Sequence, residues 1–250
     1  MSGNWGRGRD LVEIELERAT RTRTTWTIAG AMVFVAGLVV YGAVHPAAAS
    51  TGTGGAGPTA AQEIRAAVSG VGTLRVFVTL LGVLLVTSQY HHGDIVWRYL
   101  ADPSRALFVA SKAVACAVIG AFLGLVVLQL AAVMTVVHAG SLGLSRGEAA
   151  STVAGTVGAM ALAGILGVGV GASVRSQTAA VVGTLVAVLL VEPLVTAVAP
   201  AVGAYLPSAA AGAAAGGGAA LGWAAGLALY AGYAAAAAAT GVILCRRSDV

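Results

Sequence analysis

The sequence predicts an all-α membrane protein with six transmembrane helices. Of its 250 residues, 58% are hydrophobic and only 10% are charged, whereas about a quarter of the residues of a soluble domain are charged. The apolar residues form runs of about 20 residues, the length that crosses a bilayer core. Basic residues gather at the ends of these runs, which is typical of membrane proteins and does not indicate a nucleic-acid partner.

A polar segment, residues 1–25, precedes the first apolar run. Five apolar residues within it recur at spacings of three and four, which predicts a helix with one apolar face: Leu11, Val12, Ile14, Leu16 and Ala19. Acidic residues come early in this helix and arginines come late, which suits the helix dipole. We expect an amphipathic helix on the cytoplasmic membrane surface. The alternative is a solvated tail.

The six predicted spans occupy a single transmembrane domain, residues 26–250. They comprise residues 26–44, 71–87, 113–137, 149–174, 178–199 and 221–244. Trp26 and Tyr41 are expected at the two interfaces of the first span. A cleaved secretory signal is an alternative for this first region, because small residues follow at 45–50. The preceding acidic residues and the length of the apolar run argue against it.

The basic residues also predict the orientation of the spans. Eleven of them lie on the side of the two termini and two lie on the opposite side. The eleven are Arg7, Arg9, Arg18, Arg21, Arg23, Arg98, Arg105, Lys112, Arg175, Arg246 and Arg247, and the two are Arg65 and Arg146. Because basic residues favour the cytoplasmic side, we expect both termini in the cytoplasm. The expected location is the cell (plasma) membrane, of the bacterial inner-membrane type.

A polar segment, residues 88–112, separates the second and third spans. Asp102 and Pro103 form a typical helix start, so the next helix should begin near Ser104. His91 and His92 are adjacent and would point about 100° apart on a helix, which does not favour a metal site. The segment is therefore predicted to be a cytoplasmic surface that ends where the third span begins.

Two charged residues lie within predicted spans. Glu192 is the only acid deep in a span, and such a residue suggests a gate or a substrate pathway, together with the helix-breaking Pro193 beside it. The alternative is a local structural hydrogen bond near the outer end of the fifth span. Arg75 can reach the interface with its long side chain, and a pathway role is the alternative.

Small residues are frequent in the remaining apolar regions. Residues 200–220 are apolar but rich in Gly and Pro, so we expect them to dip into the membrane where protein covers them. Glycines four residues apart, as at Gly120 with Gly124 and at Gly222 with Gly226, allow helices to approach closely. Packing within one subunit and dimerisation are both open interpretations.

Several kinds of chemistry are missing from the sequence. A nucleotide-binding P-loop needs a lysine after a glycine-rich loop, and the only lysine, Lys112, follows Ala110 and Ser111. Zinc-protease and serine-hydrolase motifs do not occur. Cys116 and Cys245 do not form a disulfide or metal framework. The chain is therefore not expected to be an enzyme or to hold a cofactor or a metal of its own.

The polar segment 88–112 resembles one stretch of the membrane subunits of type-2 ABC exporters. That stretch commonly contains Glu-Tyr-Arg-His-Gly-Thr, followed by Pro-x-Arg and then Ala-Lys. The matching residues are Tyr90, His92, Gly93, Pro103, Arg105 and Lys112, and the differing ones are Gln89, His91, Asp94 and Ser111. Similar too are Arg175-Ser176-Gln177 at the next cytoplasmic turn and Glu192-Pro193 before Tyr205-Leu206-Pro207.

This resemblance implies a permease without an ATPase site of its own. Its partners would be a separate ABC ATPase subunit carrying ATP and Mg²⁺, a second permease copy (the same chain or a related one), and membrane lipid. The segment after the second span would act as a coupling helix, residues 11–23 as an elbow helix and residues 194–220 as an extracellular re-entrant hairpin. The implied ATPase-coupling residues are Gln89, Tyr90, His91, His92, Gly93, Asp94, Arg98, Pro103, Arg105 and Lys112. A hydrophobic drug, a lipid or a peptide would be a compatible export substrate.

An ion- or proton-coupled secondary carrier is the main alternative. It would call for paired acids within the spans or for inverted repeats with broken helices, and the sequence contains only Glu192 and no clear repeat. A membrane-embedded enzyme or assembly factor would need catalytic side chains clustered at one depth, and no such cluster is visible.

Overall fold

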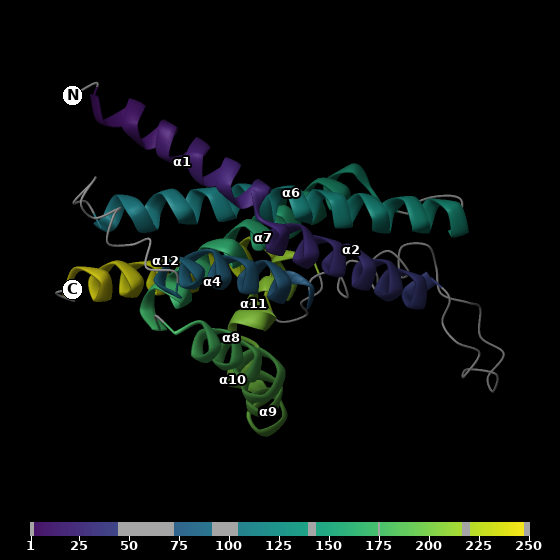
Figure 1. The fold of residues 1–250 in the computed structure, drawn as a ribbon. Helices are drawn as coiled ribbons and strands as arrows, with labels where there is room; N and C mark the ends of the chain where they lie inside the picture. Colours follow the sequence, from purple (N-terminus) through teal and green to yellow (C-terminus); the bar gives the residue numbers. More distant parts are fainter. Residues whose placement is uncertain are drawn as a thin grey trace.

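The computed structural model describes residues 3–44, 73–91, 105–139, 144–174, 176–216 and 221–247. In these ranges the chain forms helices and short connections and no strands (Figure 1). The helices are α1 (Gly3–Arg21), α2 (Arg23–Val44), α4 (Arg75–His91), α6 (Arg105–Ala139), α7 (Arg146–Val174), α8 (Gln177–Val186), the π-helical turn η1 (Ala187–Val191), α9 (Glu192–Val198), α10 (Pro200–Gly203), α11 (Pro207–Ala214) and α12 (Trp223–Arg247).

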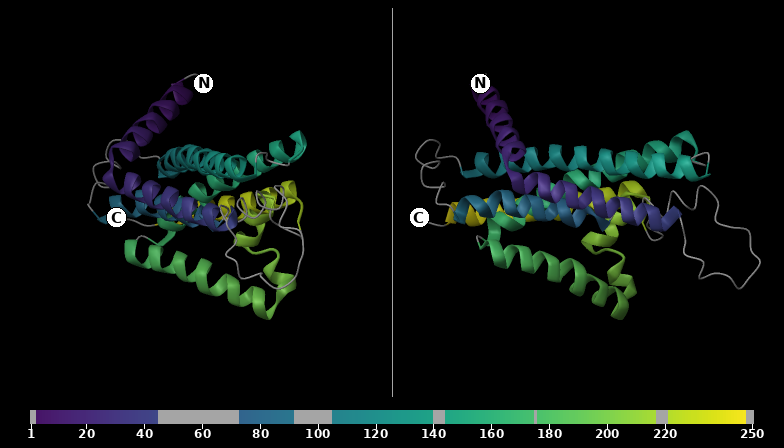
Figure 2. Two further views of the ribbon diagram at one scale, coloured as in Figure 1. Left: turned by 90° about the vertical axis from the view of Figure 1, so that its right-hand side faces the viewer. Right: turned by 45° about the vertical axis from the view of Figure 1, so that its right-hand side comes forward.

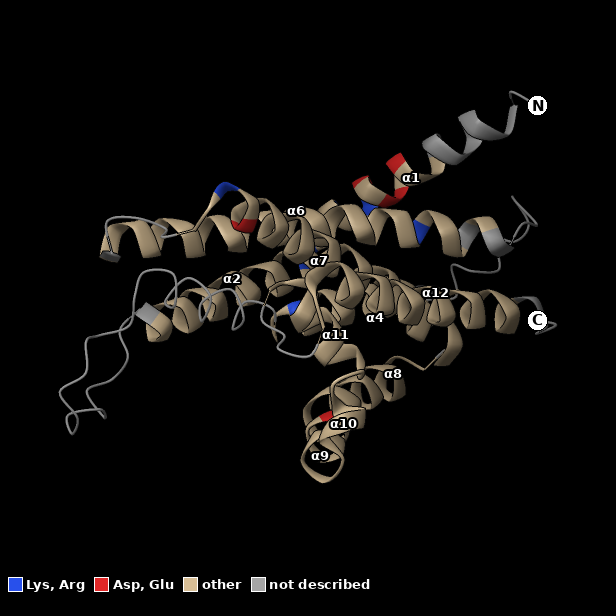
Figure 3. Ribbon diagram, turned by 180° about the vertical axis from the view of Figure 1, so that it is seen from behind, with Lys and Arg blue, Asp and Glu red and all other residues tan. Residues whose placement is uncertain are grey.

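The described helices are those of a multi-pass, all-α membrane protein. Five segments are long and apolar enough to cross a bilayer: α2, α6, α7, the continuous stretch from α8 to α9, and α12. The span expected at 71–87 corresponds to α4, an apolar helix of 17 residues that is shorter than the ~20 residues of a typical span. Charged residues are sparse along the bundle, and most lie on α1 or near helix ends (Figure 3).

Helix α7 is the centre of the bundle, with α4, α6 and α12 packed around it. Its glycines explain this position, because three of them face the backbone of three different neighbours. A Cβ atom would overlap α6 at Gly164, α4 at Gly167 and α12 at Gly169. Small residues therefore let four helices approach one another closely. Gly120 and Gly226 likewise face backbone atoms of α7 and α11, which favours packing within the subunit over dimerisation as their role.

The segment from α8 to α10 leaves this bundle as an arm, and the chain then returns through α11 (Figures 1 and 2). Pro200 and Pro207 stand in the first turns of α10 and α11, where a missing N–H costs nothing. Helix α11 is mostly alanine, and its buried face packs on α12 and α7. The phenol of Tyr233 on α12 donates a hydrogen bond to the Tyr205 carbonyl at 3.0 Å.

Helix α1 differs from its sequence-based description in two ways. It begins at Gly3, so the acidic residues do not lie in its first turn and the expectation that they lie early in the helix is wrong. Ile14 is 50% exposed, whereas Glu15 and Ala19 are buried. The buried face of α1 therefore includes an acidic residue in place of one of the expected apolar residues.

Helix α6 starts at Arg105, one residue from the expected start, and continues without a break into the third expected span. The end of the polar segment 88–112 thus forms the first turns of a 35-residue helix. Ser111 and Lys112 are buried there and do not lie on a surface. Trp26 and Tyr41, expected at membrane interfaces, are both exposed on α2.

Candidate functional site

The ten predicted coupling residues divide into those that the structure describes and those that it does not. Gln89, Tyr90 and His91 form the last turn of α4, and Arg105 and Lys112 belong to α6. His92, Gly93, Asp94, Arg98 and Pro103 lie outside the described residues. The described members therefore flank the 92–104 connection on both sides.

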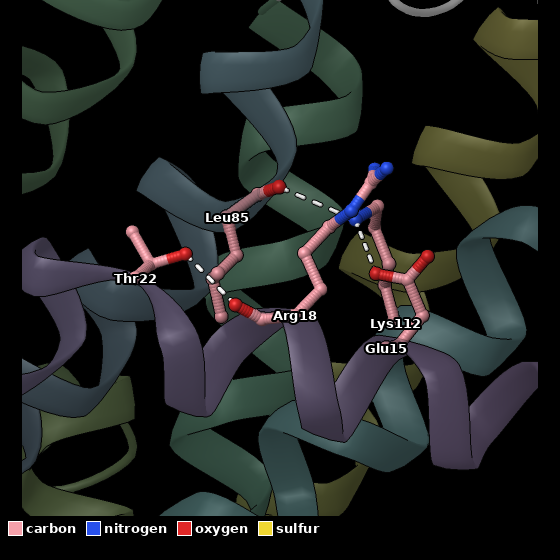
Figure 4. Close-up of polar contacts among 5 residues, drawn as sticks. All are labelled: Glu15, Arg18, Thr22, Leu85 and Lys112. Carbon is pink, nitrogen blue, oxygen red and sulfur yellow. Dashed lines mark hydrogen bonds and ion pairs between the residues drawn. The ribbon is translucent and has the colours of Figure 1, made fainter.

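Lys112 has the most defined environment of these residues. Its ammonium Nζ donates to Glu15 Oε2 on α1 at 2.8 Å and to the Leu85 carbonyl on α4 at 3.3 Å (Figure 4). The side chains of Lys112 and Glu15 are only 2% and 5% exposed. The ion pair therefore joins α1, α4 and α6 at a buried point.

The Glu15–Lys112 ion pair is better suited to positioning than to stabilising. Moving two charges out of water costs several kcal/mol per ion, and their attraction only about balances this cost when the geometry is good. Removing one partner, by contrast, costs about 3–5 kcal/mol, because the other charge stays buried. The pair thus fixes where α1 lies against α6, since a displaced α1 would separate the charges.

Sequence reasoning did not identify Glu15 as a site residue, although a signal was present. Val12, Glu15 and Ala19 are spaced by three and four residues, so the acid shares a face with apolar residues. The second member of the pair, Lys112, is the only lysine of the sequence and directly precedes an apolar run. An acid on an apolar helix face, together with a single lysine beside an apolar run, indicates a buried ion pair.

A second feature is a cavity of about 270 Å³ between the bundle and the arm, which we call the Arg75–Glu192 cavity. Its walls come from α4, α7, the α8–α9 segment, α11 and α12. Most of its lining is aliphatic. The polar lining residues are Arg75, Thr79, Thr184, Glu192, Ser208 and Tyr230.

Glu192 reaches this cavity because the fifth predicted span is not a regular α-helix. An α-helix turns by about 100° per residue, so Glu192 would otherwise point about 120° away from Ala180, which also lines the cavity. Pro193 has no N–H to continue the α-helical ladder, and the Glu192 N–H bonds five residues back to the Ala187 carbonyl. This wider π-turn takes up part of the rotation and brings Glu192 onto the cavity side.

The Glu192 carboxylate also has a structural contact. Its Oε2 accepts a hydrogen bond from the Ser208 backbone N–H at 2.8 Å, at the start of α11. A carboxylate at a helix N-terminus is stabilised by otherwise unbonded N–H groups and by the helix dipole. The sequence is compatible with a local hydrogen bond or a pathway role for Glu192, and the structure shows the hydrogen bond together with a place on the cavity wall.

Arg75 lies on the α4 wall of the same cavity and is partly buried. Its guanidinium interacts electrostatically with Glu192 and with Tyr230, a phenol that is 2% exposed. Tyr230 in turn interacts with Thr79. Arg75 is thus directed into the protein beside other polar groups.

No group of three potential metal-ligating side chains occurs among the residues that the structure describes. A scan against protein-family models and a search of curated proteins found no match for this chain. Its function must therefore be inferred from the segment around the 92–104 connection and from the cavity.

Proposed function

We propose that the chain is the permease subunit of an ATP-driven exporter that resembles type-2 ABC exporters and works with a separate ATPase subunit. The observation that carries this proposal is the position of the Glu15–Lys112 ion pair. The connection predicted to dock on the ATPase joins α4 to α6, and Lys112 ties both helices to α1. A push on this connection would therefore move three helices together.

In this proposal Lys112 is a positioning residue. Its ammonium group is buried, so it cannot contact a partner in this arrangement. Gln89, Tyr90 and Arg105 flank the docking segment at the ends of α4 and α6. Direct contact with the ATPase is assigned to them and to residues 91–94, 98 and 103.

The proposed topology has six spans, with α1 as the elbow helix and the α9–α11 reversal as the extracellular hairpin. The start of α1 and the end of α12 lie toward the same end of the bundle, which supports an even number of crossings (Figures 1 and 2). Exposed apolar side chains on α2 and the arm, such as Phe34 and Leu190, suit contact with lipid or with a second permease copy.

Purification and reconstitution test the proposal. The protein should bring down an ATPase, and the reconstituted complex should hydrolyse ATP faster than the ATPase alone. Tyr90→Ala with His92→Ala should abolish this stimulation. Tyr205→Ala, an exposed tyrosine on the arm side, is the matched control and should keep it. Absence of an ATPase, or full stimulation by the double variant, would contradict the proposal.

The Arg75–Glu192 cavity favours a second candidate, a secondary carrier driven by an ion or proton gradient. Ionisable residues inside a membrane bundle often mark ion or proton pathways. The purified chain in proteoliposomes distinguishes the two candidates. Substrate movement driven by a pH gradient without any ATPase would support the carrier and contradict the exporter.

A further inference from the structure

The Arg75–Glu192 cavity has a polar end and an apolar end. Helices α4 and α7 run side by side in the same direction, because Thr79 lies against Gly167 and Val83 lies against Gly171. Arg75 and Thr79 therefore lie at the opposite end of the cavity from Val174 at the end of α7. The Ser176 backbone N–H donates to the Val174 carbonyl at 2.7 Å, so the start of α8 lies beside Val174.

The polar end receives groups from four elements. Arg75 and Thr79 come from α4, Tyr230 from α12, Glu192 from α9 and Ser208 from the start of α11. The apolar end is lined by aliphatic side chains of α7 and by small residues of α8. From Ala179 to Glu192 the wall extends over about 20 Å at 1.5 Å per residue.

The charges of the polar end select the ligand. A cation and a carboxylate lie on different walls of one cavity, Arg75 on α4 and Glu192 on α9. A ligand with one charge would be attracted by one of these groups and repelled by the other. A headgroup with both charges is attracted by both, with its anionic part toward Arg75 and its cationic part toward Glu192.

The volume limits the rest of the ligand. About 270 Å³ lies just below the ~300–1,000 Å³ of common ligand pockets. An apolar cavity of about 270 Å³ with a wall about 20 Å long suits one slender alkyl chain better than a bulky ring system. Gly183 lies on this wall, and its Cα faces open space, with no atom within 4 Å of a Cβ built there.

We propose that the Arg75–Glu192 cavity binds a zwitterionic amphiphile, with the headgroup between Arg75 and Glu192 and a single apolar chain along α7 and α8. The ligand has two sources with the same chemistry, a zwitterionic lipid of the membrane and a separate single-chain amphiphile. Binding at this site does not require an ATPase, so it holds or fails independently of the proposed exporter function.

The test uses the purified full-length protein in a neutral maltoside detergent. The probe is dodecylphosphocholine with a photoreactive diazirine on its chain, and labelled peptides are identified by mass spectrometry. Unlabelled dodecylphosphocholine, dodecyl sulfate and dodecyltrimethylammonium compete at equal chain length. The label is expected on α7 and α8, with dodecylphosphocholine as the strongest competitor. Label confined to other helices would overturn the proposal.

Charge variants test how the headgroup is recognised. Glu192→Gln should weaken binding of dodecylphosphocholine by about tenfold and shift the binding preference of the site toward dodecyl sulfate. Arg75→Gln should shift this preference toward dodecyltrimethylammonium. Glutamine at position 192 keeps an acceptor for the Ser208 N–H, so α11 stays capped. Arg146→Gln, an exposed cation at the start of α7, is the control and should change nothing. If both cavity variants change the competition by all three detergents to the same extent, the proposal is overturned.

Two glycine-to-leucine variants, one inside the cavity and one outside it, test the site without changing its charged residues. Gly183→Leu fills the apolar part of the cavity and should abolish labelling. Gly30→Leu on α2 also has open space at its Cβ position, lies outside the cavity and should leave labelling unchanged. Labelling that persists in Gly183→Leu contradicts the proposal.

Bilayer nanodiscs distinguish the two sources. If a membrane lipid occupies the site, nanodiscs of zwitterionic lipid will suppress probe labelling and nanodiscs of anionic lipid will not. If a separate amphiphile is the ligand, the label will appear in both. Absence of the label in both kinds of nanodisc would restrict binding to detergent and overturn the proposal.

Discussion

Replacement of Lys112 by methionine should release α1 from the bundle. The variant removes the cation that contacts Glu15 in an environment where the two side chains are 2% and 5% exposed. Breaking a buried ion pair by removing one partner costs about 3–5 kcal/mol. Helix α1 contacts mainly α6 and α2, so the cost should appear as local undocking of α1 before the bundle itself unfolds.

The assay is the maleimide labelling rate of a cysteine at position 19, since Ala19 is buried on the docked face of α1. Both native cysteines are buried. If opening is faster than labelling, a loss of about 3–5 kcal/mol raises the labelling rate by about two to three and a half orders of magnitude at 1.4 kcal/mol per tenfold change. Glu15→Met should have the same effect.

The double variant Glu15→Met with Lys112→Met should restore the protection of the cysteine at position 19 from maleimide. Replacing both members of a buried pair by apolar residues of similar volume is neutral or stabilising by about 1–4 kcal/mol. Glu17→Met is the control on the same helix, because the Glu17–Arg21 pair at 2.6 Å is 58% and 79% exposed. An exposed pair of this kind contributes no more than about 0.5 kcal/mol.

Two results would refute this reasoning. The first is a Lys112→Met protein in which the thiol at position 19 stays as protected as in the wild type. The second is a double variant in which the thiol is as reactive as in either single variant. Either result would mean that the Glu15–Lys112 pair does not hold α1 in place.

Three further predictions concern the bundle, the arm and the topology. Gly167→Ala should lower stability by about 1–3 kcal/mol in a thermal melt, because its methyl group overlaps the α4 backbone, whereas Gly183→Ala has open space and should not. Glu192→Ala should speed amide exchange at the start of α11 by removing the acceptor of one N–H, an effect of about 1 kcal/mol that Glu192→Gln avoids. Cysteines introduced at the exposed Ser145 and Ser176 should react with impermeant reagent from the outside and from the cytoplasm respectively, and reaction of both from the same side would contradict the proposed spans.

The helical membrane class and most helix positions follow from local properties of the sequence. Apolar runs of spanning length become helices because a bilayer leaves backbone groups no other partners. Asp102 and Pro103 predict a helix start near Ser104, one residue from the observed start of α6 at Arg105. The prediction succeeds because a capping side chain and a fixed proline φ act locally. The Gly and Pro content of 200–220 likewise indicated that this stretch is not a plain span.

The candidate sites were predicted less completely. Glu192 and Arg75 were singled out because charges within apolar runs are costly, but their meeting in one cavity was not foreseen. Their places on the wall of one cavity depend on the π-turn before Pro193 and on the return of α11 to the bundle. Glu15 was not identified as a site residue, because the periodicity of α1 alone does not tell which face of the helix is covered.

The sequence by itself determined that this chain is a helical membrane protein, that it lacks a nucleotide-binding loop, and that 88–112 is the main polar interruption. These properties depend on composition and on spacings of a few residues. Only the tertiary structure decided that Lys112 is buried against Glu15 and that Arg75 shares a cavity with Glu192. Both pairs join residues about 100 positions apart in the chain, and such pairs form only once glycine-lined helices have packed to a particular depth and rotation.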